Sequence, residues 1–273
     1  MLNGVTGKPY LAAVTLLGGL VACGGGGGST PTTPTNPTPP TPNVNACGAI
    51  AQTVSGLTAI TNGVDCATQN TSVMRLNMSD PHGGLGSCSG TVIAPRAVLT
   101  AAHCLDGGVT EVLVWRGIGE QIRASSFKGH PSYNSNNVTA VDVGVVFVNE
   151  DLERPIVPLL LSRQGQVGET AVVAGWGQDL QQRPAFLRAG TTTLSSVSPD
   201  LLRTVFSTMS SGICQGDSGG PILLSEGGTW SVAGIISATS ASTCNTGEHF
   251  YAAVRGTAIR DFIRENVPNL TER

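Results

Sequence analysis

The chain has few charged and few aromatic side chains for its 273 residues. Charged residues make up 12% of it and aromatic residues 4%, whereas glycine occurs 36 times. This composition suits many short strands joined by turns more than a helical bundle. Strand-like runs at residues 111–115, 141–148, 170–174 and 230–238 agree with it, and only residues 257–266 show the apolar spacing of a helix.

The chain also lacks a surplus of basic residues. Lys8 is the only charged residue among the first 59, and residues 60–273 hold 14 basic against 18 acidic side chains. Proteins that bind nucleic acids carry clustered positive charge, so we expect no nucleic-acid partner. The cysteine and histidine residues show no metal-ligand spacing, so we expect no metal and no cofactor.

The apolar run at the N-terminus is too short to cross a membrane. It starts at Leu11 and is interrupted by two glycines before Leu20-Val21-Ala22-Cys23, whereas a span needs about 20 residues. Residues 1–22 are typical of a secretory signal peptide. Their end resembles the lipobox of bacterial lipoproteins, in which the cysteine is acylated, so we expect Cys23 to be a lipid anchor. The alternative is an ordinary signal peptide cleaved near Ala22.

Residues 23–45 combine a glycine run with a stretch rich in threonine and proline. Such a segment cannot bury a core, and it predicts a flexible and then extended linker. At about 3 Å per residue, its roughly 20 residues reach on the order of 60 Å. We therefore expect a lipid-anchored protein of the bacterial envelope, facing the periplasm or the cell exterior, with its domain clear of the bilayer.

Two segments contain the parts of an activated nucleophile. They are Cys214-Gln215-Gly216-Asp217-Ser218-Gly219-Gly220-Pro221 and Thr100-Ala101-Ala102-His103-Cys104. A serine hydroxyl is a weak nucleophile, so it needs a neutral imidazole to take its proton and backbone amides to hold the oxyanion. Glycines beside Ser218 permit a tight turn in which the amides of Gly216 and Ser218 point at one spot. Taken alone, the segment around Ser218 is also typical of a surface turn, and the segment around His103 is also typical of a histidine packed in the core.

This chemistry also needs an acid that orients the imidazole. Asp142 lies in a valine-rich run, where a buried carboxylate requires a partner. The alternative is that Asp142 is an exposed acid at the start of a strand and orients no histidine. The three residues occur in the order His103, Asp142, Ser218, with spacings of 39 and 76 residues.

In these residues and their order, the chain resembles the trypsin/chymotrypsin-like serine protease family. Shorter matches follow the family's order over most of residues 60–273, and in one of them Ser89 replaces a glycine, which is a mild change. These matches are Ser87-Cys88-Ser89-Gly90, His130-Pro131-Ser132-Tyr133, Ala174-Gly175-Trp176-Gly177 and Gly234-Ile235-Ile236-Ser237.

The resemblance implies an all-β fold of two six-stranded antiparallel β-barrels. The active site would lie between the barrels, and the C-terminal helix would pack on the second barrel. It also implies a serine endopeptidase that acts as a monomer on proteins or peptides. His103 would be the base, Asp142 would orient it, Ser218 would attack the carbonyl, and the amides of Gly216 and Ser218 would form the oxyanion hole.

Seven cysteines leave one without a disulfide partner, and a lipidated Cys23 leaves an even six. The resemblance implies two pairs, Cys88–Cys104 and Cys214–Cys244. Cys47 and Cys66 then remain and pair by elimination. Disulfides of this kind predict an oxidising compartment.

Members of the family are usually made as zymogens, and the resemblance implies the same for this chain. Ile60-Thr61-Asn62-Gly63 resembles the start of the activated family members, which implies that the freed ammonium of Ile60 pairs with Asp217. Residues 46–59 would be a propeptide-like segment before a protease domain at residues 60–273. Ala59 precedes the cleavage site, so the activating protease must accept a small residue, and self-activation is one hypothesis.

The resemblance also implies which residues line the substrate pocket. They are Gly212, Ile213, Ser237, Ala238, Thr239 and His249. Gly212 occupies the position at which trypsins carry an aspartate for lysine or arginine, so we expect no tryptic preference. Thr239 replaces a glycine and narrows the pocket, which favours small apolar residues. The alternative is a preference for acidic residues, if a protonated His249 lies at the base of the pocket.

A function of another class is a catalytically idle binding module on the same fold. Such a module usually lacks the histidine or the serine, whereas this chain has His103, Asp142 and Ser218. We therefore predict a secreted, lipid-anchored bacterial serine endopeptidase that hydrolyses peptide bonds after small apolar residues.

Overall fold

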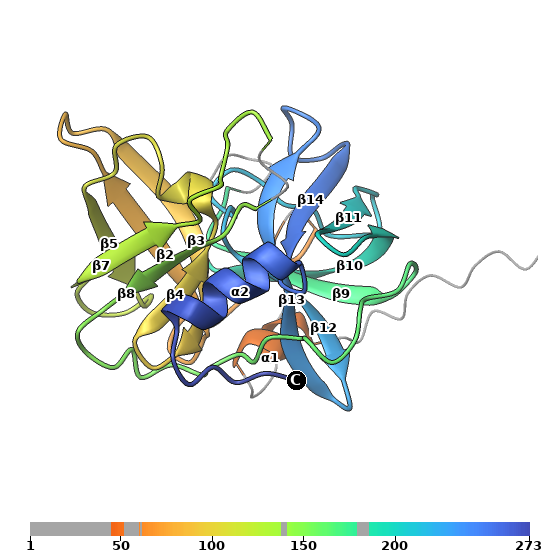
Figure 1. Cartoon of the computed structure of the whole chain (residues 1–273). Helices are drawn as coiled ribbons and strands as arrows, with labels where there is room; N and C mark the ends of the chain where they lie inside the picture. The colour runs from red at the N-terminus through yellow and green to blue at the C-terminus, as the bar shows by residue number, and fades with distance from the viewer. Residues whose placement is uncertain (1–44, 52–59, 61, 138–140, 179–185) are drawn as a thin grey trace, which may run out of the picture. The chain divides into compact units, whose positions relative to one another are not determined.

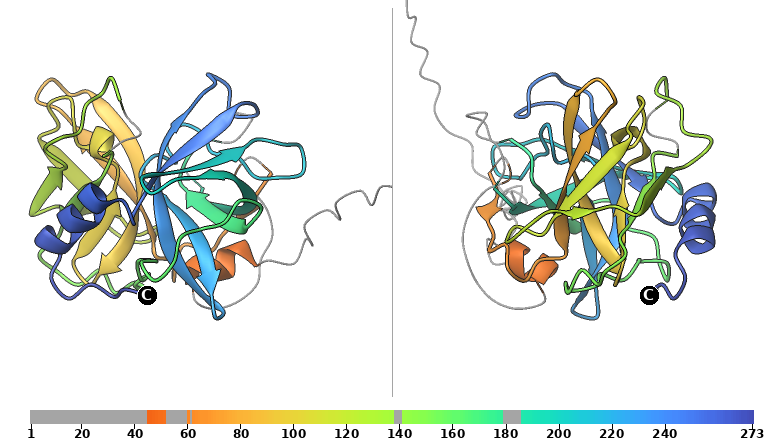
Figure 2. Two further views of the ribbon diagram at one scale, coloured as in Figure 1. Left: turned by 45° about the vertical axis from the view of Figure 1, so that its right-hand side comes forward. Right: turned by 90° about the vertical axis from the view of Figure 1, so that its left-hand side faces the viewer.

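The computed structural model describes residues 45–51, 60, 62–137, 141–178 and 186–273. These residues form two antiparallel β-barrels, two α-helices and one short 3-10 helix, as Figures 1 and 2 show. The predicted signal peptide, lipidated cysteine, activation cleavage site and nearly all of the linker lie outside them. In the part of the chain described here, no helix has the length and apolar character needed to cross a membrane.

The first barrel is formed by residues 73–147, in the order β6-β5-β2-β3-β4-β8-β7. Between β6 and β7, the Ala124 amide donates to the carbonyl of Val112 and the Ser125 amide to that of Phe147, at 2.9 and 2.8 Å. These two short strands therefore act as one interrupted strand that closes a six-stranded barrel. The strands are β2 (Val73–Ser79), β3 (Leu85–Ala94), β4 (Ala97–Thr100), β5 (Glu111–Trp115), β6 (Ile122–Arg123), β7 (Ser126–Gly129) and β8 (Gly144–Phe147).

The second barrel has the order β1-β10-β11-β14-β13-β12-β9, and β9 also pairs with β10. Six strands thus close on themselves, which confirms the predicted pair of six-stranded barrels. The short β1 adds an edge on β10, with Asp65 opposite Arg188. The strands are β1 (Val64–Asp65), β9 (Thr170–Gly175), β10 (Arg188–Val197), β11 (Leu201–Val205), β12 (Pro221–Glu226), β13 (Thr229–Thr239) and β14 (Glu248–Ala253).

The strands form where small and β-branched residues can fill a barrel interior. Strand β5 has buried Val112 and Val114 alternating with partly exposed residues, the period-2 pattern of a strand with one buried face. All four residues of β4 are buried, and the strand is paired on both edges, with β3 and with β8. The predicted strand at 111–115 is confirmed, whereas the run at 141–148 forms only the four residues of β8 because its first residues enter the active site.

The C-terminal helix α2 (Thr257–Asn266) has the predicted bounds. Its buried residues are Ile259, Phe262 and Ile263, at the spacing i, i+3, i+4. The expectation that it packs on the second barrel is not what its contacts show. The Phe262 ring lies 5.1 Å from that of His130, and Lys128 Nζ on β7 lies 3.1 Å from Asn266 Oδ1. The helix thus follows the second barrel in sequence but packs against the first (Figure 1).

The sequence analysis missed the helix α1 (Ala46–Ala51), which lies in the predicted propeptide-like segment. Its six residues are too few to show a helical period. Ile50 is buried, and its carbonyl accepts both the amide and the hydroxyl of Ser72 at 2.9 Å. A disulfide joins Cys47 to Cys66. Residues 46–51 of this segment are therefore packed against the protease domain.

Candidate active site

His103 and Asp142 lie at the ends of two paired strands of the first barrel. His103 is in the 3-10 helix η1 (Ala102–Cys104) after β4, and Asp142 precedes β8. The Asp142 carboxylate is fully buried. Its Oδ2 lies 2.7 Å from His103 Nδ1, and its Oδ1 accepts the His103 backbone amide at 2.9 Å. An ionised carboxylate only accepts hydrogen bonds, so Nδ1 carries a proton and Nε2 of the neutral ring can accept one.

Ser237 has a role that the sequence did not indicate. It was predicted to line the substrate pocket, but its hydroxyl donates to Asp142 Oδ2 at 2.6 Å. Ser237 lies on β13 of the second barrel, whereas Asp142 belongs to the first. The hydroxyl therefore fixes the orienting carboxylate across the boundary between the barrels.

The Ser218 turn lies directly before β12 of the second barrel, and it needs its glycines. Gly216 has a φ of 93° and Gly219 a φ of 80°, in the left-handed region that favours glycine. A Cβ on Gly219 would lie 2.1 Å from Thr100 Oγ1 and 2.4 Å from the carbonyl of Ser89. The turn is therefore pressed against the first barrel at the residue after Ser218.

Ser89, which the sequence analysis described as a mild change from glycine, holds this turn in place. Its amide donates to the carbonyl of Ser218 at 2.7 Å, and its hydroxyl donates to the carbonyl of Gly216 at 2.8 Å. The same hydroxyl accepts the amide of Trp176 at 2.9 Å. All three bonds join the first barrel to the second.

We expect Ser89→Ala to lower both stability and turnover. It leaves the buried amide of Trp176 without its acceptor, which costs about 1–3 kcal/mol of unfolding free energy. It also frees the Gly216 peptide, and kcat should fall roughly tenfold because a displaced oxyanion amide binds the transition state less well. Urea unfolding and steady-state kinetics measure the two effects, with Ser125→Ala, an exposed hydroxyl bonded to the carbonyl of Phe147, as the control. An unchanged kcat in Ser89→Ala would contradict this role.

The amides of Gly216 and Ser218 fit the predicted oxyanion hole. Within the described ranges, neither amide donates a hydrogen bond to a protein acceptor. Both residues are partly exposed. Two amides on one glycine-rich turn are therefore available to an oxygen atom of a bound substrate.

His103, Ser218 and Gly216 line one open cleft of about 450 Å³. One wall comes from the start of β3 and includes Leu85, which is 86% exposed. The loop after His103 forms the opposite wall, with Asp106 and Val109. The cleft is large enough for a stretch of extended peptide, and it brings the predicted base and nucleophile from the two barrels to one surface.

The three predicted disulfides are present. They join Cys47 to Cys66, Cys88 to Cys104 and Cys214 to Cys244. The Cys88–Cys104 bond lies within reach of His103, and the potential ligand atoms of these three residues fall within 4.8 Å of one another. Because both sulfur atoms are in the disulfide, they are not thiolate ligands for a metal.

Asp217, which directly precedes Ser218, is buried. One of its carboxylate oxygens accepts the amide of Gly177 and the other that of Cys214, both at 2.8 Å. Burial raises the pKa of Asp217 to about 6, against the opposing effect of these two bonds. Ile60, its predicted partner after cleavage, is also buried, and no hydrogen bond or ion pair joins the two in the described part of the uncleaved chain.

The structure brings Gly212, His249 and Thr239 together. Thr239 on β13 lies opposite His249 on β14. A Cβ on Gly212 would lie 2.8 Å from Cε1 of His249 and 2.8 Å from the ring of Phe206. Ile213 is buried, while Ala238 and Thr239 are more exposed. Phe206 was not predicted at this position, because nothing in its local sequence distinguishes it from other strand-end aromatics.

The His249 side chain is buried in an apolar setting. Its Nδ1 lies 3.5 Å from Thr204 Oγ1, and Nε2 has no hydrogen-bond partner among the described residues. The Thr204 hydroxyl also bonds the Tyr251 hydroxyl at 2.9 Å. Burial lowers the pKa of His249 from 6.5 to about 4, so the ring is neutral at pH 7.

This lowered pKa predicts a loss of stability in acid. Below pH 6.5 the unfolded chain binds a proton at His249 that the folded chain does not bind until about pH 4, so the contribution of His249 to the unfolding free energy falls by about 3 kcal/mol as the pH drops from 7 to 4. Urea unfolding at both pH values, on a Ser218→Ala background to prevent autolysis, should show a smaller acid loss in His249→Gln. Asp217, whose pKa is raised, makes the unfolding free energy change with pH in the opposite direction. This contribution is the same in the parent and the variants, so it cancels when their acid losses are compared. His82→Gln, at an exposed site, should behave as the parent, and equal acid losses in all three proteins would refute the prediction.

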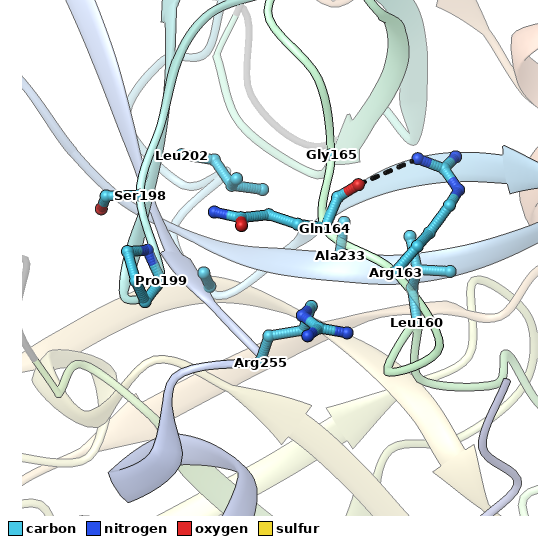
Figure 3. A pocket seen from close by; sticks show the side chains of 10 residues that line it. Leu160, Arg163, Gln164, Gly165, Ser198, Pro199, Leu202, Ala233 and Arg255 are labelled. Atoms are coloured by element: carbon cyan, nitrogen blue, oxygen red, sulfur yellow. Dashed lines mark hydrogen bonds between the residues drawn. The ribbon is translucent and has the colours of Figure 1, made fainter.

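A second cavity, shown in Figure 3, is too small for a substrate. It lies between the loop at residues 160–165 and the hairpin at residues 198–202, and its volume is about 10 Å³. Arg163 and Arg255 approach it, and Arg163 Nη1 donates to the carbonyl of Gln164 at 3.2 Å. A space of this size holds one water molecule at most.

Comparisons with known proteins agree with this geometry. Chymotrypsin-like elastase family member 1 from Bos taurus is 32% identical over 189 residues, which cover 58% of this chain and 70% of that protein. Trypsin beta from Drosophila erecta is 29% identical over 179 residues, covering 56% and 69%. A solved structure of HL collagenase covers 76% of this chain and 98% of its own, with a TM-score of 0.63 and 22% identity, a likeness that concerns the fold.

The family model for trypsin matches residues 60–263, about three quarters of the chain. The match begins at Ile60 and spans both barrels and most of α2. With His103, Asp142 and Ser218 inside the matched region, the chain belongs to the trypsin family of serine endopeptidases.

Proposed function

We propose that His103, Asp142 and Ser218 form the catalytic triad of this endopeptidase. Ser218 attacks the carbonyl of the substrate while His103 Nε2 takes its proton, and the amides of Gly216 and Ser218 hold the oxyanion. His103 then gives the proton to the leaving amine, and water repeats the sequence on the acyl-enzyme. The observation that carries this proposal is the 2.7 Å contact between His103 and the fully buried Asp142, together with the shared position of His103 and Ser218 in one cleft.

The proposal is tested by labelling with a fluorophosphonate, which reacts only with an activated serine. A chain with a free Ile60 should be labelled at Ser218, as located by mass spectrometry, and Ser218→Ala should not be labelled. Ser132→Ala, at an exposed serine outside the cleft, is the matched control and should be labelled like the parent. A free-Ile60 protein with intact disulfides that takes no label would favour the idle binding module.

We further propose that the enzyme cleaves after small apolar residues. Gly212 supplies no charge for lysine or arginine, and the rings of His249 and Phe206 lie where a side chain on Gly212 would be. A long substrate side chain that extends toward Gly212 would meet both rings. One methylene too many in such a space changes kcat/KM by roughly 10- to 200-fold.

A digest of a mixed peptide library tests this specificity, with Ser218→Ala as the blank. Cuts after alanine, valine or threonine that are absent from the blank support the small apolar pocket. Cuts after lysine or arginine would refute it.

The alternative preference for acidic residues depends on His249. Its ring lies beside Gly212, and its buried Nε2 has no hydrogen-bond partner among the described residues. With a pKa near 4, however, the ring takes up a proton at neutral pH only if a substrate carboxylate offsets the cost of burial. Cuts after glutamate that disappear in His249→Gln would support this alternative.

We propose that the protein is a secreted bacterial lipoprotein, anchored through Cys23. The order of the N-terminal residues supports this, and three disulfides are typical of an oxidising compartment. Metabolic labelling with a palmitate analogue should mark the parent and leave Cys23→Ser unmarked. Equal labelling of the two proteins, or none, would refute the anchor.

A further inference from the structure

The carboxylate of Asp217 controls the position of the proposed oxyanion amides, because it lies between Gly216 and Ser218 in the chain. It is buried and accepts two amides, from Gly177 and Cys214. A Cβ on Gly177 would lie 2.5 Å from the carboxyl carbon of Asp217, so the acid lies directly against this glycine. Burying an ionised carboxylate costs several kcal/mol unless a positive charge lies nearby.

Arg188 supplies such a charge from inside the protein. It is the first residue of β10, where it lies opposite Gly175 on β9, and its side chain is almost fully buried. Its Nη1 donates to the carbonyl of Gly177 at 3.4 Å, while the amide of the same residue donates to Asp217. Attraction to Arg188 lowers the pKa of Asp217, against the larger effect of burial. Arg188 thus bonds the carbonyl of Gly177, and Asp217 bonds the amide of the same residue.

The short strand β1, which follows the activation cleavage site in the sequence, lies beside Arg188. Strand β1 lies on β10, with Asp65 opposite Arg188, and Asp65 Oδ1 lies 3.3 Å from Arg188 Nε. Ile60 is buried against the core of the second barrel. Among the described residues of the uncleaved chain, therefore, Arg188 is a cation that already acts on Asp217 before any new ammonium exists.

We propose that Arg188 is a positioning residue that holds Asp217, and through it the oxyanion amides, in the working arrangement before Ile60 is freed, so that the uncleaved chain is already partly active. This inference rests on the proposed roles of Ser218 and Asp217. Cleavage then adds a second positive charge beside Asp217 and increases activity without switching it on from zero.

One protein can be measured before and after cleavage. In the protein made for this test, Asp-Asp-Asp-Asp-Lys replaces residues 55–59, so that added enteropeptidase frees Ile60. Mass spectrometry verifies the uncut and the cut form. The readout is the rate at which a fluorophosphonate labels Ser218. We expect the uncut chain to react within about a hundredfold of the cut chain, since the cost of an unpaired buried acid is largely offset.

Arg188→Met separates positioning from a general structural effect. In the uncut form it should slow labelling by roughly tenfold to a hundredfold, because Asp217 loses its attraction to the buried guanidinium of Arg188. In the cut form, where the Ile60 ammonium provides a charge, the loss should be less than about threefold. Arg188→Lys should recover part of the uncut rate, and Arg163→Met, which removes a cation paired with Glu169, should change neither form.

The outcomes are distinct. A cut parent chain that takes no label refutes the proposed site and this inference together. A cut chain that reacts beside an uncut chain that does not refutes this inference alone, and this comparison needs no variant to fold. Equal losses in both forms of Arg188→Met would mean that Arg188 is structural.

Discussion

Asp142→Asn should lower kcat by about 10⁴-fold and leave KM nearly unchanged, the size of effect that this change has in a Ser-His-Asp triad. The carboxylate accepts from His103 Nδ1 at 2.7 Å and from the Ser237 hydroxyl at 2.6 Å. An asparagine can turn its NH₂ group toward the ring, and the ring then carries its proton on Nε2, the atom that the proposed mechanism needs as its acceptor. A base with its acceptor atom protonated cannot take the serine proton. Steady-state kinetics on a peptide ester measure the loss.

Asp151→Asn is the matched control, because Asp151 is exposed and its carboxylate caps only the amide of Glu153. It should retain the parent's kcat. The melting temperature of Asp142→Asn should also stay close to that of the parent, so that the lost turnover is not lost protein. A decrease in kcat of less than tenfold would mean that Asp142 is not the orienting acid.

Gly219→Ala should abolish activity and destabilise the domain by several kcal/mol. The added methyl group would overlap Thr100 Oγ1 and the carbonyl of Ser89, at 2.1 and 2.4 Å. The carbonyl belongs to backbone and cannot rotate away, so the Ser218 turn must move from the first barrel. A positive φ at this residue adds about 1–2 kcal/mol of strain for alanine. Urea unfolding and fluorophosphonate labelling measure the two losses.

Gly228→Ala is the control that separates the backbone strain of a positive φ from the overlap of the added methyl group with the first barrel. Gly228 has almost the same φ, 82°, but a Cβ there would meet nothing within 4 Å, in the hairpin between β12 and β13. This variant should lose only about 1–2 kcal/mol and keep its activity. If both glycine variants behave alike, the collision with the first barrel does not control the Ser218 turn.

The residues of the proposed chemistry could be predicted from sequence because each lies in a short segment with its own chemical requirement. Ser218 needs glycines around it, and Asp142 is an acid in a valine run. The structure places the histidine and the aspartate together as expected. Their roles, and that of Ile60, remain proposals to be tested.

The supporting residues could not be predicted, because their contacts join distant parts of the chain. Ser89 and Ser237 are ordinary serines in strands, and their partners are 127 and 95 residues away. The two barrels were implied by the resemblance, but α1 has too few residues to show a period. The packing of α2 on the first barrel depends on His130 and Lys128, to which the helix sequence gives no clue.

The bonds that Ser89 and Ser237 make across the boundary between the barrels have a mechanical consequence. The proposed base His103 and its acid Asp142 lie on the first barrel and the proposed nucleophile Ser218 lies on the second, so the distance between base and nucleophile depends on how the two barrels are aligned. A small sliding of one barrel over the other breaks these hydrogen bonds, while the strand pairing within each barrel is kept. Under mild denaturant or force, the enzyme should therefore lose its activity before it unfolds. A measurement of activity would then show whether the two barrels are still aligned.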